Sequence, residues 1–263
     1  MNFSEKMKTF GFNQALSYLE KDPETNIPKL MALADRLIPK DEFTAQRNSI
    51  RNAIERKNNW YQLILRLYEL DPGTRVTFFR NFILNANIFG WPEQDKNREK
   101  YGCNIPWTIL LDPTSACNLH CTGCWAAEYG HKLNLSYEDI DSIIEQGKKL
   151  GIYLYIYTGG EPLVRKKDLI RLCEKHSDCI FLCFTNATLI DEDFCKEMLR
   201  VKNFIPSISL EGFEEANDSR RGKGVYARVM DAMHLLKAHK LPFGISVCYT
   251  SVNCDDISSE KFF

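Results

Sequence analysis

Five short apolar runs in the second half of the chain constrain its fold more than any other feature. They cover residues 107–111, 152–157, 179–184, 204–210 and 243–249. Amphipathic segments separate them, and we expect helices near 136–151, 167–175, 191–200 and 225–239. Strand-length apolar runs that alternate with helices are typical of βαβ units and a parallel sheet. The sequence therefore predicts an α/β fold for this part of the chain.

The first hundred residues carry a different pattern, because their apolar residues recur three and four positions apart, as in WYQLILRLYEL. This spacing predicts helices. Proline cannot continue a helix, so we expect breaks at Asp22-Pro23, Pro39-Lys40 and Asp71-Pro72-Gly73. The stretch from Gly90 through the charged run EQDKNREK is interpreted as a linker. We therefore predict an α-helical N-terminal region with a linker over 1–100 and a second domain over 101–263.

Composition narrows the class of protein. The formal net charge of -1 gives no reason to expect nucleic acid or an anionic membrane as a partner. The N-terminal residues lack the apolar stretch of a secretory signal, and no run approaches the length of a membrane span. We expect a cytoplasmic protein. In that reducing compartment, clustered cysteines more often bind metal or react than form disulfides.

Unusual segments follow four of the predicted strands. A group of three cysteines follows the first, and the second, third and fourth lead into TGGEP (158–162), TNAT (185–188) and SLEG (209–212). In a parallel α/β array the loops that leave the carboxyl ends of the strands gather on one face, where active sites are built. We therefore expect these four segments to converge.

Cys117, Cys121 and Cys124 have the spacing C-x3-C-x2-C. Three thiolates can hold three irons of a four-iron, four-sulfur cluster and leave the fourth iron open to a small molecule. The alternative is a zinc site completed by His120 or Cys103, because zinc prefers four nitrogen or sulfur ligands. Most of the remaining cysteines are interpreted as small core residues.

The other candidate residues each have two interpretations. Gly159 and Gly160 free the backbone to approach a ligand, and their carbonyls with the Glu161 carboxylate would suit an ammonium group. A plain strand-ending turn would need the same glycines. Asn186 and Asn253 follow strands and fit turns.

Ser209 and Glu211 point to one face of a strand, where they could bind sugar hydroxyls. Alternatively, Ser209 is a small filling residue and Glu211 a solvated strand end. Arg221 lies in RRGKG, which fits an anion-binding turn before a helix, where arginine can bind a carboxylate. A solvated basic loop is the alternative.

Together, these motifs resemble the radical S-adenosylmethionine superfamily over residues 105–256. The cysteine loop after the first strand and GGEP after the second form a specific pair. TNAT resembles a TNGT-like stretch of that family. SLEG followed by NDSRRGKGVY resembles members with C-terminal auxiliary clusters, which include peptide-modifying maturases and molybdenum-cofactor-synthesis enzymes.

The resemblance implies that Cys117, Cys121 and Cys124 hold a 4Fe-4S cluster whose open iron is chelated by S-adenosylmethionine. Reductive cleavage of S-adenosylmethionine would give a 5'-deoxyadenosyl radical that abstracts a hydrogen atom from the substrate. The resemblance also implies that Gly159, Gly160 and Glu161 hold the methionine amino group of S-adenosylmethionine. Ser209 and Glu211 would contact its ribose, and Arg221 would bind its carboxylate. Trp125 is expected beside the cluster or the adenine.

This sequence departs from the family pattern at Glu211, where Asp is commoner, at Ala187, where Gly is commoner, and at Gly123, where an aromatic residue usually stands. The family core has six strand-helix units, and the sequence shows five strands. The resemblance therefore implies a partial, open TIM-type barrel that is incomplete at its C-terminus.

The implied partners are an external electron donor such as flavodoxin or ferredoxin and a substrate that is a peptide or a small molecule, such as a cofactor precursor. No nucleic acid or membrane partner is expected. The competing hypothesis is a noncatalytic interaction module that binds zinc or an iron-sulfur cluster, or an inactive fragment of such an enzyme.

Overall fold

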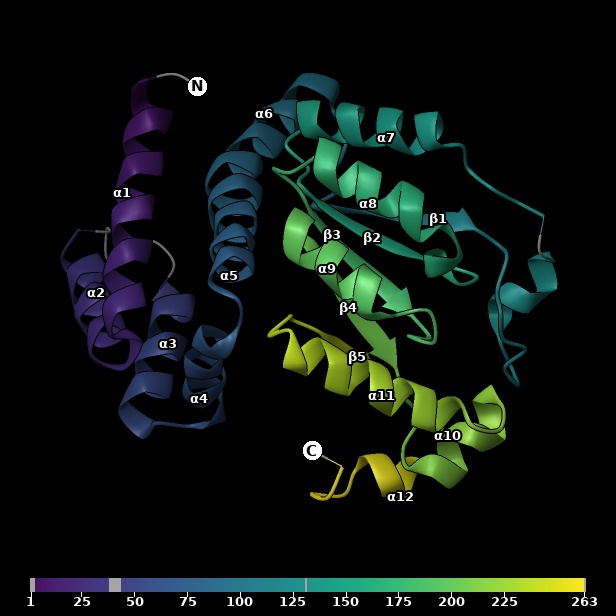
Figure 1. The fold of residues 1–263 in the computed structure, drawn as a ribbon. Helices are drawn as coiled ribbons and strands as arrows, with labels where there is room; N and C mark the ends of the chain where they lie inside the picture. Colours follow the sequence, from purple (N-terminus) through teal and green to yellow (C-terminus); the bar gives the residue numbers. More distant parts are fainter. Residues whose placement is uncertain (1–2, 38–43, 131, 263) are drawn as a thin grey trace. The chain divides into compact units, whose positions relative to one another are not determined.

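The computed structural model describes residues 3–37, 44–130 and 132–262 (Figure 1). Contacts between residues divide the chain into two compact units, Met1–Val76 and Thr77–Phe263. None of the described helices combines the length and the hydropathy needed to cross a bilayer.

The first unit is helical, as the sequence predicts. It contains α1 (Phe3–Lys21), α2 (Pro23–Leu37), α3 (Thr44–Arg56), α4 (Asn59–Arg66), η1 (Leu67–Glu69) and the start of α5 (Pro72–Phe79). The breaks expected at Pro23 and Pro72 are confirmed, and the one at Pro39 lies outside the described residues. Tyr61 is buried and its hydroxyl donates to the Glu24 carbonyl at 3.0 Å, which fixes α4 against the start of α2.

The expected linker after Gly90 is instead helical. The π-helical segment η2 (Arg80–Gly90) continues directly into α6 (Trp91–Tyr101), and both belong to the second unit. The buried Gln94 side chain donates to the Gly151 carbonyl at 2.8 Å, and a Cβ on Gly90 would come within 2.5 Å of that same oxygen. Charged residues on the solvent side of α6 gave this segment its linker-like composition. A domain division near residue 100 stays a prediction.

The second unit contains a five-stranded parallel sheet with the strand order β1-β2-β3-β4-β5. The strands are β1 (Thr108–Thr114), β2 (Leu154–Gly159), β3 (Ile180–Thr185), β4 (Phe204–Ser209) and β5 (Gly244–Ser246). Their connections contain η3 (Trp125–Tyr129), α7 (Tyr137–Lys149), η4 (Pro162–Arg165), α8 (Lys166–Lys175), α9 (Glu192–Val201), α10 (Glu214–Arg221) and α11 (Val225–Ala238), and α12 (Cys254–Ile257) follows β5. The sheet does not close, because β1 and β5 form its two edges, which confirms the predicted open α/β architecture.

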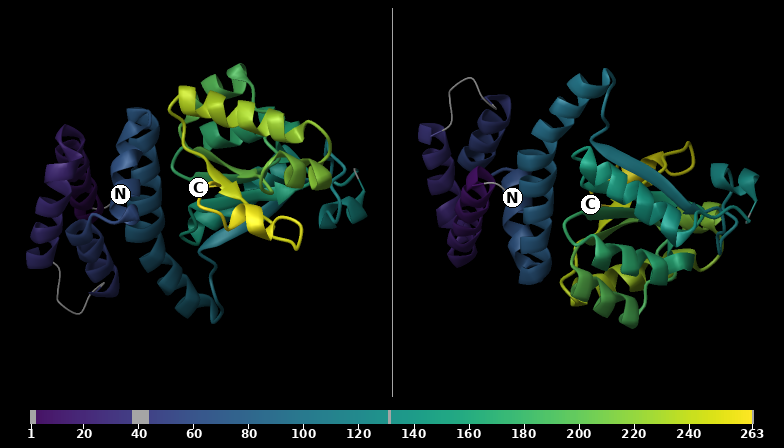
Figure 2. Two further views of the ribbon diagram at one scale, coloured as in Figure 1. Left: turned by 90° about the horizontal axis from the view of Figure 1, so that it is seen from below. Right: turned by 90° about the horizontal axis from the view of Figure 1, so that it is seen from above.

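Helices α7, α8, α9 and α11 lie along one side of this sheet (Figures 1 and 2). The core lies between the two layers, where Tyr157 and Phe181 stack with ring centroids 5.5 Å apart. Leu110, Ile156 and Leu182 occupy adjacent register positions and point to the opposite face. Leu110 there is 57% exposed. One face of the sheet therefore supports the fold, while the other stays open beside the carboxyl ends of the strands.

Candidate active site

The three cysteines line one pocket of about 220 Å³ at the carboxyl ends of the strands. The predicted convergence is confirmed, because the pocket draws residues from the segments after β1, β2 and β3, from the end of β4 and from α10. Its lining consists of Cys117, Cys121, Cys124, Trp125, Thr158, Gly159, Gly160, Glu161, Phe184, Thr185, Asn186, Ser209, Arg220 and Arg221. Of the predicted site residues, only Glu211 is absent from this lining.

The GGE segment holds the start of the cysteine loop. The Gly160 amide donates to the Thr114 carbonyl at 2.9 Å, and the Glu161 amide donates to the Ala116 carbonyl at 2.8 Å. A Cβ on Gly160 would lie 2.3 Å from the Ala116 oxygen, so no other residue fits at this position. The close approach that requires Gly160 is thus to the cysteine loop itself.

Helix α10 holds the other end of the cysteine loop. The Thr122 amide donates to the Arg220 carbonyl at 2.8 Å, and Arg220 Nε donates back to the Thr122 carbonyl at 3.3 Å. The sequence reading missed this helix because its residues are almost all polar. A helix placed directly before RRGKG is what brings Arg220 and Arg221 to the pocket.

Glu161 is 1% exposed and connects the segments that follow β2 and β3. Its carboxylate accepts hydrogen bonds from the Leu163 amide at 2.9 Å, the Thr185 hydroxyl at 2.7 Å and the Asn186 amide at 2.7 Å. Burial raises the pKa of the Glu161 carboxyl, although these three hydrogen bonds oppose the shift. The carboxylate therefore braces the pocket wall, and its contact with an ammonium group stays a prediction.

Glu211 is also 1% exposed, so the interpretation as a solvated strand end is wrong. Its carboxylate pairs with the guanidinium groups of Arg220 and Arg221 and accepts a hydrogen bond from the Cys248 amide at 2.9 Å. The solvated-loop alternative for Arg221 is wrong as well, because its side chain is mostly buried in this ion pair. Ser209 lines the pocket, whereas Glu211 lies behind the two arginines and positions them.

Two asparagines that the sequence suggested only as turn residues take part in the site. Asn186 donates to the Asn118 side chain at 2.8 Å, and its Nδ2 lies 4.0 Å from the Cys117 sulfur. Asn253 donates to the Glu211 carbonyl at 2.8 Å. Their burial was the missing information, since a turn signal does not distinguish an exposed asparagine from a buried one.

The arrangement of the thiols favours a polynuclear cluster over a single zinc ion. A structural zinc ion prefers four nitrogen or sulfur ligands. The lining of the pocket contains three cysteines, and neither Cys103 nor His120 belongs to it. A cluster that binds each thiolate to a separate iron and leaves one iron open fits this set of three.

The electrostatics of the thiols differ along the loop. Burial raises the pKa of both the Cys117 and the Cys121 thiols, and at Cys121 the guanidinium groups of Arg221 and Arg220 oppose this rise. Metal ligation requires thiolates, so loading the site releases protons. The arginines lower the cost of a negative charge at this end of the loop.

The chain is similar to known proteins in family, in sequence and in fold. The family model described as "Radical SAM superfamily" matches residues 111–259. The chain is 29% identical to the Fe-coproporphyrin III synthase of Methanosarcina barkeri over 57% of its length, and 26% identical to the serine-type anaerobic sulfatase-maturating enzyme of Bacteroides thetaiotaomicron, also over 57%. It spans 38% and 41% of those relatives. In fold it is similar to Streptococcus suis SuiB bound to the precursor peptide SuiA, with a TM-score of 0.54, 22% identity, and coverage of 63% of this chain and 38% of SuiB.

Proposed function

Because the chain belongs to the radical SAM superfamily and is an enzyme of that class, we propose that it binds a 4Fe-4S cluster through Cys117, Cys121 and Cys124 and cleaves S-adenosylmethionine reductively. One observation carries the proposal. The three thiols open into the same pocket as the GGE segment, Ser209 and Arg221. A cluster held by these three cysteines would have one iron without a protein ligand, next to groups that can hold an amino acid.

When bound, the cofactors supply the reductive chemistry: one electron from an external donor such as flavodoxin or ferredoxin splits the sulfonium into methionine and a 5'-deoxyadenosyl radical, which takes a hydrogen atom from the substrate. The chain supplies position and charge. Backbone carbonyls of Gly159 and Gly160 hold the methionine amino group, and Arg221 binds the carboxylate. Ser209 lies on the ribose side. Glu211 keeps the arginines in place.

The substrate is proposed to be a peptide or a small molecule. The curated relatives include a porphyrin synthase and an enzyme that matures a sulfatase, and the similar fold of SuiB was solved with a precursor peptide. These names span two substrate classes on one fold. The residues that select the substrate are therefore expected outside those proposed to hold the cluster and S-adenosylmethionine.

The test is anaerobic reconstitution with iron and sulfide, followed by reduction with dithionite and electron paramagnetic resonance with and without S-adenosylmethionine. We expect a reduced-cluster signal that shifts on adding the cofactor, and formation of 5'-deoxyadenosine. Cys121→Ala should abolish both. Cys103→Ala is the matched control, because Cys103 is exposed and lies outside the pocket.

Two results would contradict the proposal. If Cys121→Ala retains the full iron content and the cofactor-induced shift, the cysteine assignment fails. If the chain binds one zinc ion and no iron under these conditions, the noncatalytic metal-binding module becomes the better description.

A further inference from the structure

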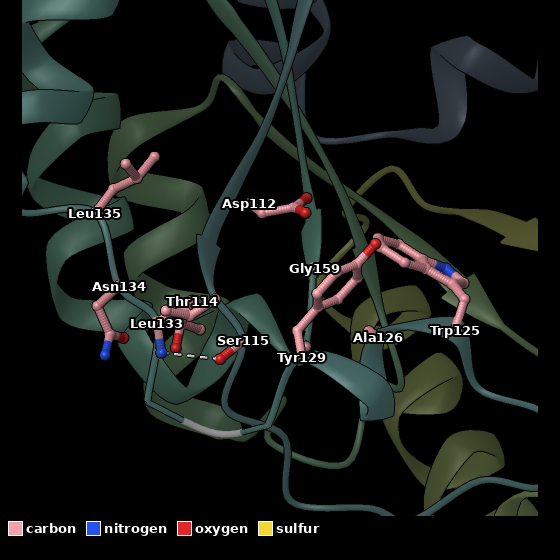
Figure 3. Close-up of a pocket in the computed structure, with 11 residues that line it drawn as sticks. Asp112, Thr114, Ser115, Trp125, Ala126, Tyr129, Leu133, Asn134, Leu135 and Gly159 are labelled. Carbon is pink, nitrogen blue, oxygen red and sulfur yellow. Dashed lines mark hydrogen bonds between the residues drawn. The ribbon is translucent and has the colours of Figure 1, made fainter.

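A second pocket, of about 360 Å³, adjoins the cysteine pocket and shares Trp125, Gly159 and Gly160 with it. It lies between the end of β1 and the segment that follows the third cysteine (Figure 3). Its remaining lining consists of Asp112, Thr114, Ser115, Ala126, Tyr129, Leu133, Asn134 and Leu135. A ligand in this pocket would lie next to the proposed cofactor site, with which the pocket shares Trp125, Gly159 and Gly160.

Among the lining residues that the structure describes, Asp112 supplies the only acidic side chain. Its side chain is exposed, whereas the neighbouring Leu111 is buried in the core. The Asp112 carboxylate makes no ion pair or hydrogen bond with any other residue that the structure describes. Asp112 is exposed to solvent, and partial desolvation of its carboxyl raises the pKa of this group. A cationic ligand would compensate that charge.

Two aromatic rings form the wall contributed by the loop. Trp125 and Tyr129 pack edge to face with centroids 5.8 Å apart, yet the two residues are 55% and 60% exposed. Figure 3 shows both rings and the Asp112 carboxylate bordering the same hollow. Aromatic faces attract organic cations, and the attraction grows as the cation loses water.

The other walls suit the hydrocarbon part of such a ligand. Leu133 and Leu135 line the pocket, and a hydrogen bond of 3.0 Å from the Leu133 amide to the Ser115 hydroxyl holds this segment at the end of β1. The backbone polar group of Leu133 is therefore already satisfied. A carboxylate, two aromatic faces and two leucines together match an alkyl chain that ends in an ammonium group.

We propose that this pocket binds the substrate through an alkylammonium group, with Asp112 as its counter-ion and Trp125 and Tyr129 as its aromatic wall. The inference rests on the proposed function, because it makes this group part of the molecule that reacts beside the cysteines. The alkylammonium group belongs either to a lysine side chain of a peptide or to a small free amine. A solvated aspartate at a strand end is the competing explanation, and it predicts no ligand preference.

The test measures binding to the full chain by saturation-transfer NMR, before and after anaerobic reconstitution. The probes are Nα-acetyl-lysine amide, its neutral analogue Nα-acetyl-norleucine amide, and n-butylamine. We expect the lysine derivative to bind about 10-fold more tightly than the norleucine derivative, and Asp112→Asn to remove that difference. Tyr129→Leu should weaken binding of the lysine derivative about threefold. Tighter binding of the lysine derivative than of n-butylamine would identify a peptide source, and equal binding a free amine.

Three results would overturn the inference: no binding of the lysine derivative, equal binding of both derivatives to the unmodified chain, or unchanged binding in Asp112→Asn. A fourth result that would overturn it concerns the binding of S-adenosylmethionine. If Asp112→Asn weakens S-adenosylmethionine binding as much as it weakens binding of the lysine derivative, Asp112 belongs to the cofactor site. Failure to form a cluster would contradict only the proposed function, since the probes also bind to the chain before reconstitution.

Discussion

Two buried glutamates flank the cysteine loop, and different partners compensate the burial of each carboxylate. Glu161 and Glu211 are each 1% exposed, and each follows a strand of the same sheet. Neutral donors surround Glu161, namely two backbone amides and a hydroxyl. Glu211 is instead held by two arginines and one backbone amide. One flank is therefore held by hydrogen bonds alone and the other by a buried ion-pair network.

The difference sets the charge at the two ends of the loop. Burial raises the pKa of both the Cys117 and the Cys121 thiols, and the nearby Glu161 charge adds to the rise at Cys117. At Cys121, Arg221 and Arg220 counteract burial. We infer that the Glu161 flank fixes the shape of the pocket, while the Glu211 flank supplies positive charge beside the thiolates.

Removing the acid from the Glu211 flank should cause the largest loss of stability. Glu211→Ala leaves Arg220 and Arg221 without their counter-ion, and we expect it to lower the free energy of unfolding by about 4 kcal/mol. Urea denaturation measures this loss. Glu197→Ala is the control, because Glu197 pairs with Arg200 at the surface and should cost less than about 1 kcal/mol. Equal losses of stability in the two variants would contradict a larger contribution from the buried ion-pair network.

Replacing the acid of the Glu161 flank should cause a smaller loss of stability. Glu161→Gln keeps one acceptor oxygen but turns an NH₂ group either toward the Asn186 amide or toward the Leu163 amide and the Thr185 hydroxyl. We expect a loss of about 2 kcal/mol at pH 7, measured by urea denaturation. Glu174→Gln, at an exposed ion pair with Arg200, is the control and should change stability little. A loss as large as that of Glu211→Ala would remove the contrast between the flanks.

The stability contribution of the Glu161 flank should also depend on pH. The pKa of Glu161 is raised in the folded state above its ordinary value of 4.5, so the folded protein binds this proton more tightly than the unfolded chain does. Its stabilising contribution is fully present below pH 4.5 and is lost as the pH rises through the folded pKa. The stability difference between the unmodified protein and Glu161→Gln should therefore shrink as the pH rises. A difference that grows with pH would contradict the raised pKa.

Much of this arrangement could be predicted from the sequence, because the relevant signals are local. The apolar runs located the strands, and the rule that strand ends share one face brought the cysteines together with GGE. Ala187 also carried information, since its φ of +60° lies in the left-handed region where glycine is commoner.

Pairings between distant residues could not be predicted in this way. Nothing in SLEG shows that Glu211 turns away from the pocket to bind two arginines about ten positions later. Polar composition concealed α10 and made α6 resemble a linker, because both helices owe their placement to tertiary contacts rather than to an apolar stripe. The hollow beside Asp112 likewise depends on where the segment after Cys124 folds back, which its sequence does not encode locally.

The smallest expected effect separates the two ends of the loop directly. Arg221→Gln removes a positive charge that lowers the pKa of Cys121, so in the chain without metal the Cys121 thiol should ionise at higher pH and react more slowly with iodoacetamide at pH 8. Peptide mass spectrometry measures each cysteine separately. Cys117 is the internal control, because its pKa is set by burial, by the hydrogen bond from the Leu119 amide and by nearby acidic and thiol groups. An equal slowing at Cys117 and Cys121 would mean that the variant loosens the whole loop, and the charge asymmetry between the flanks would then have no effect on the thiols.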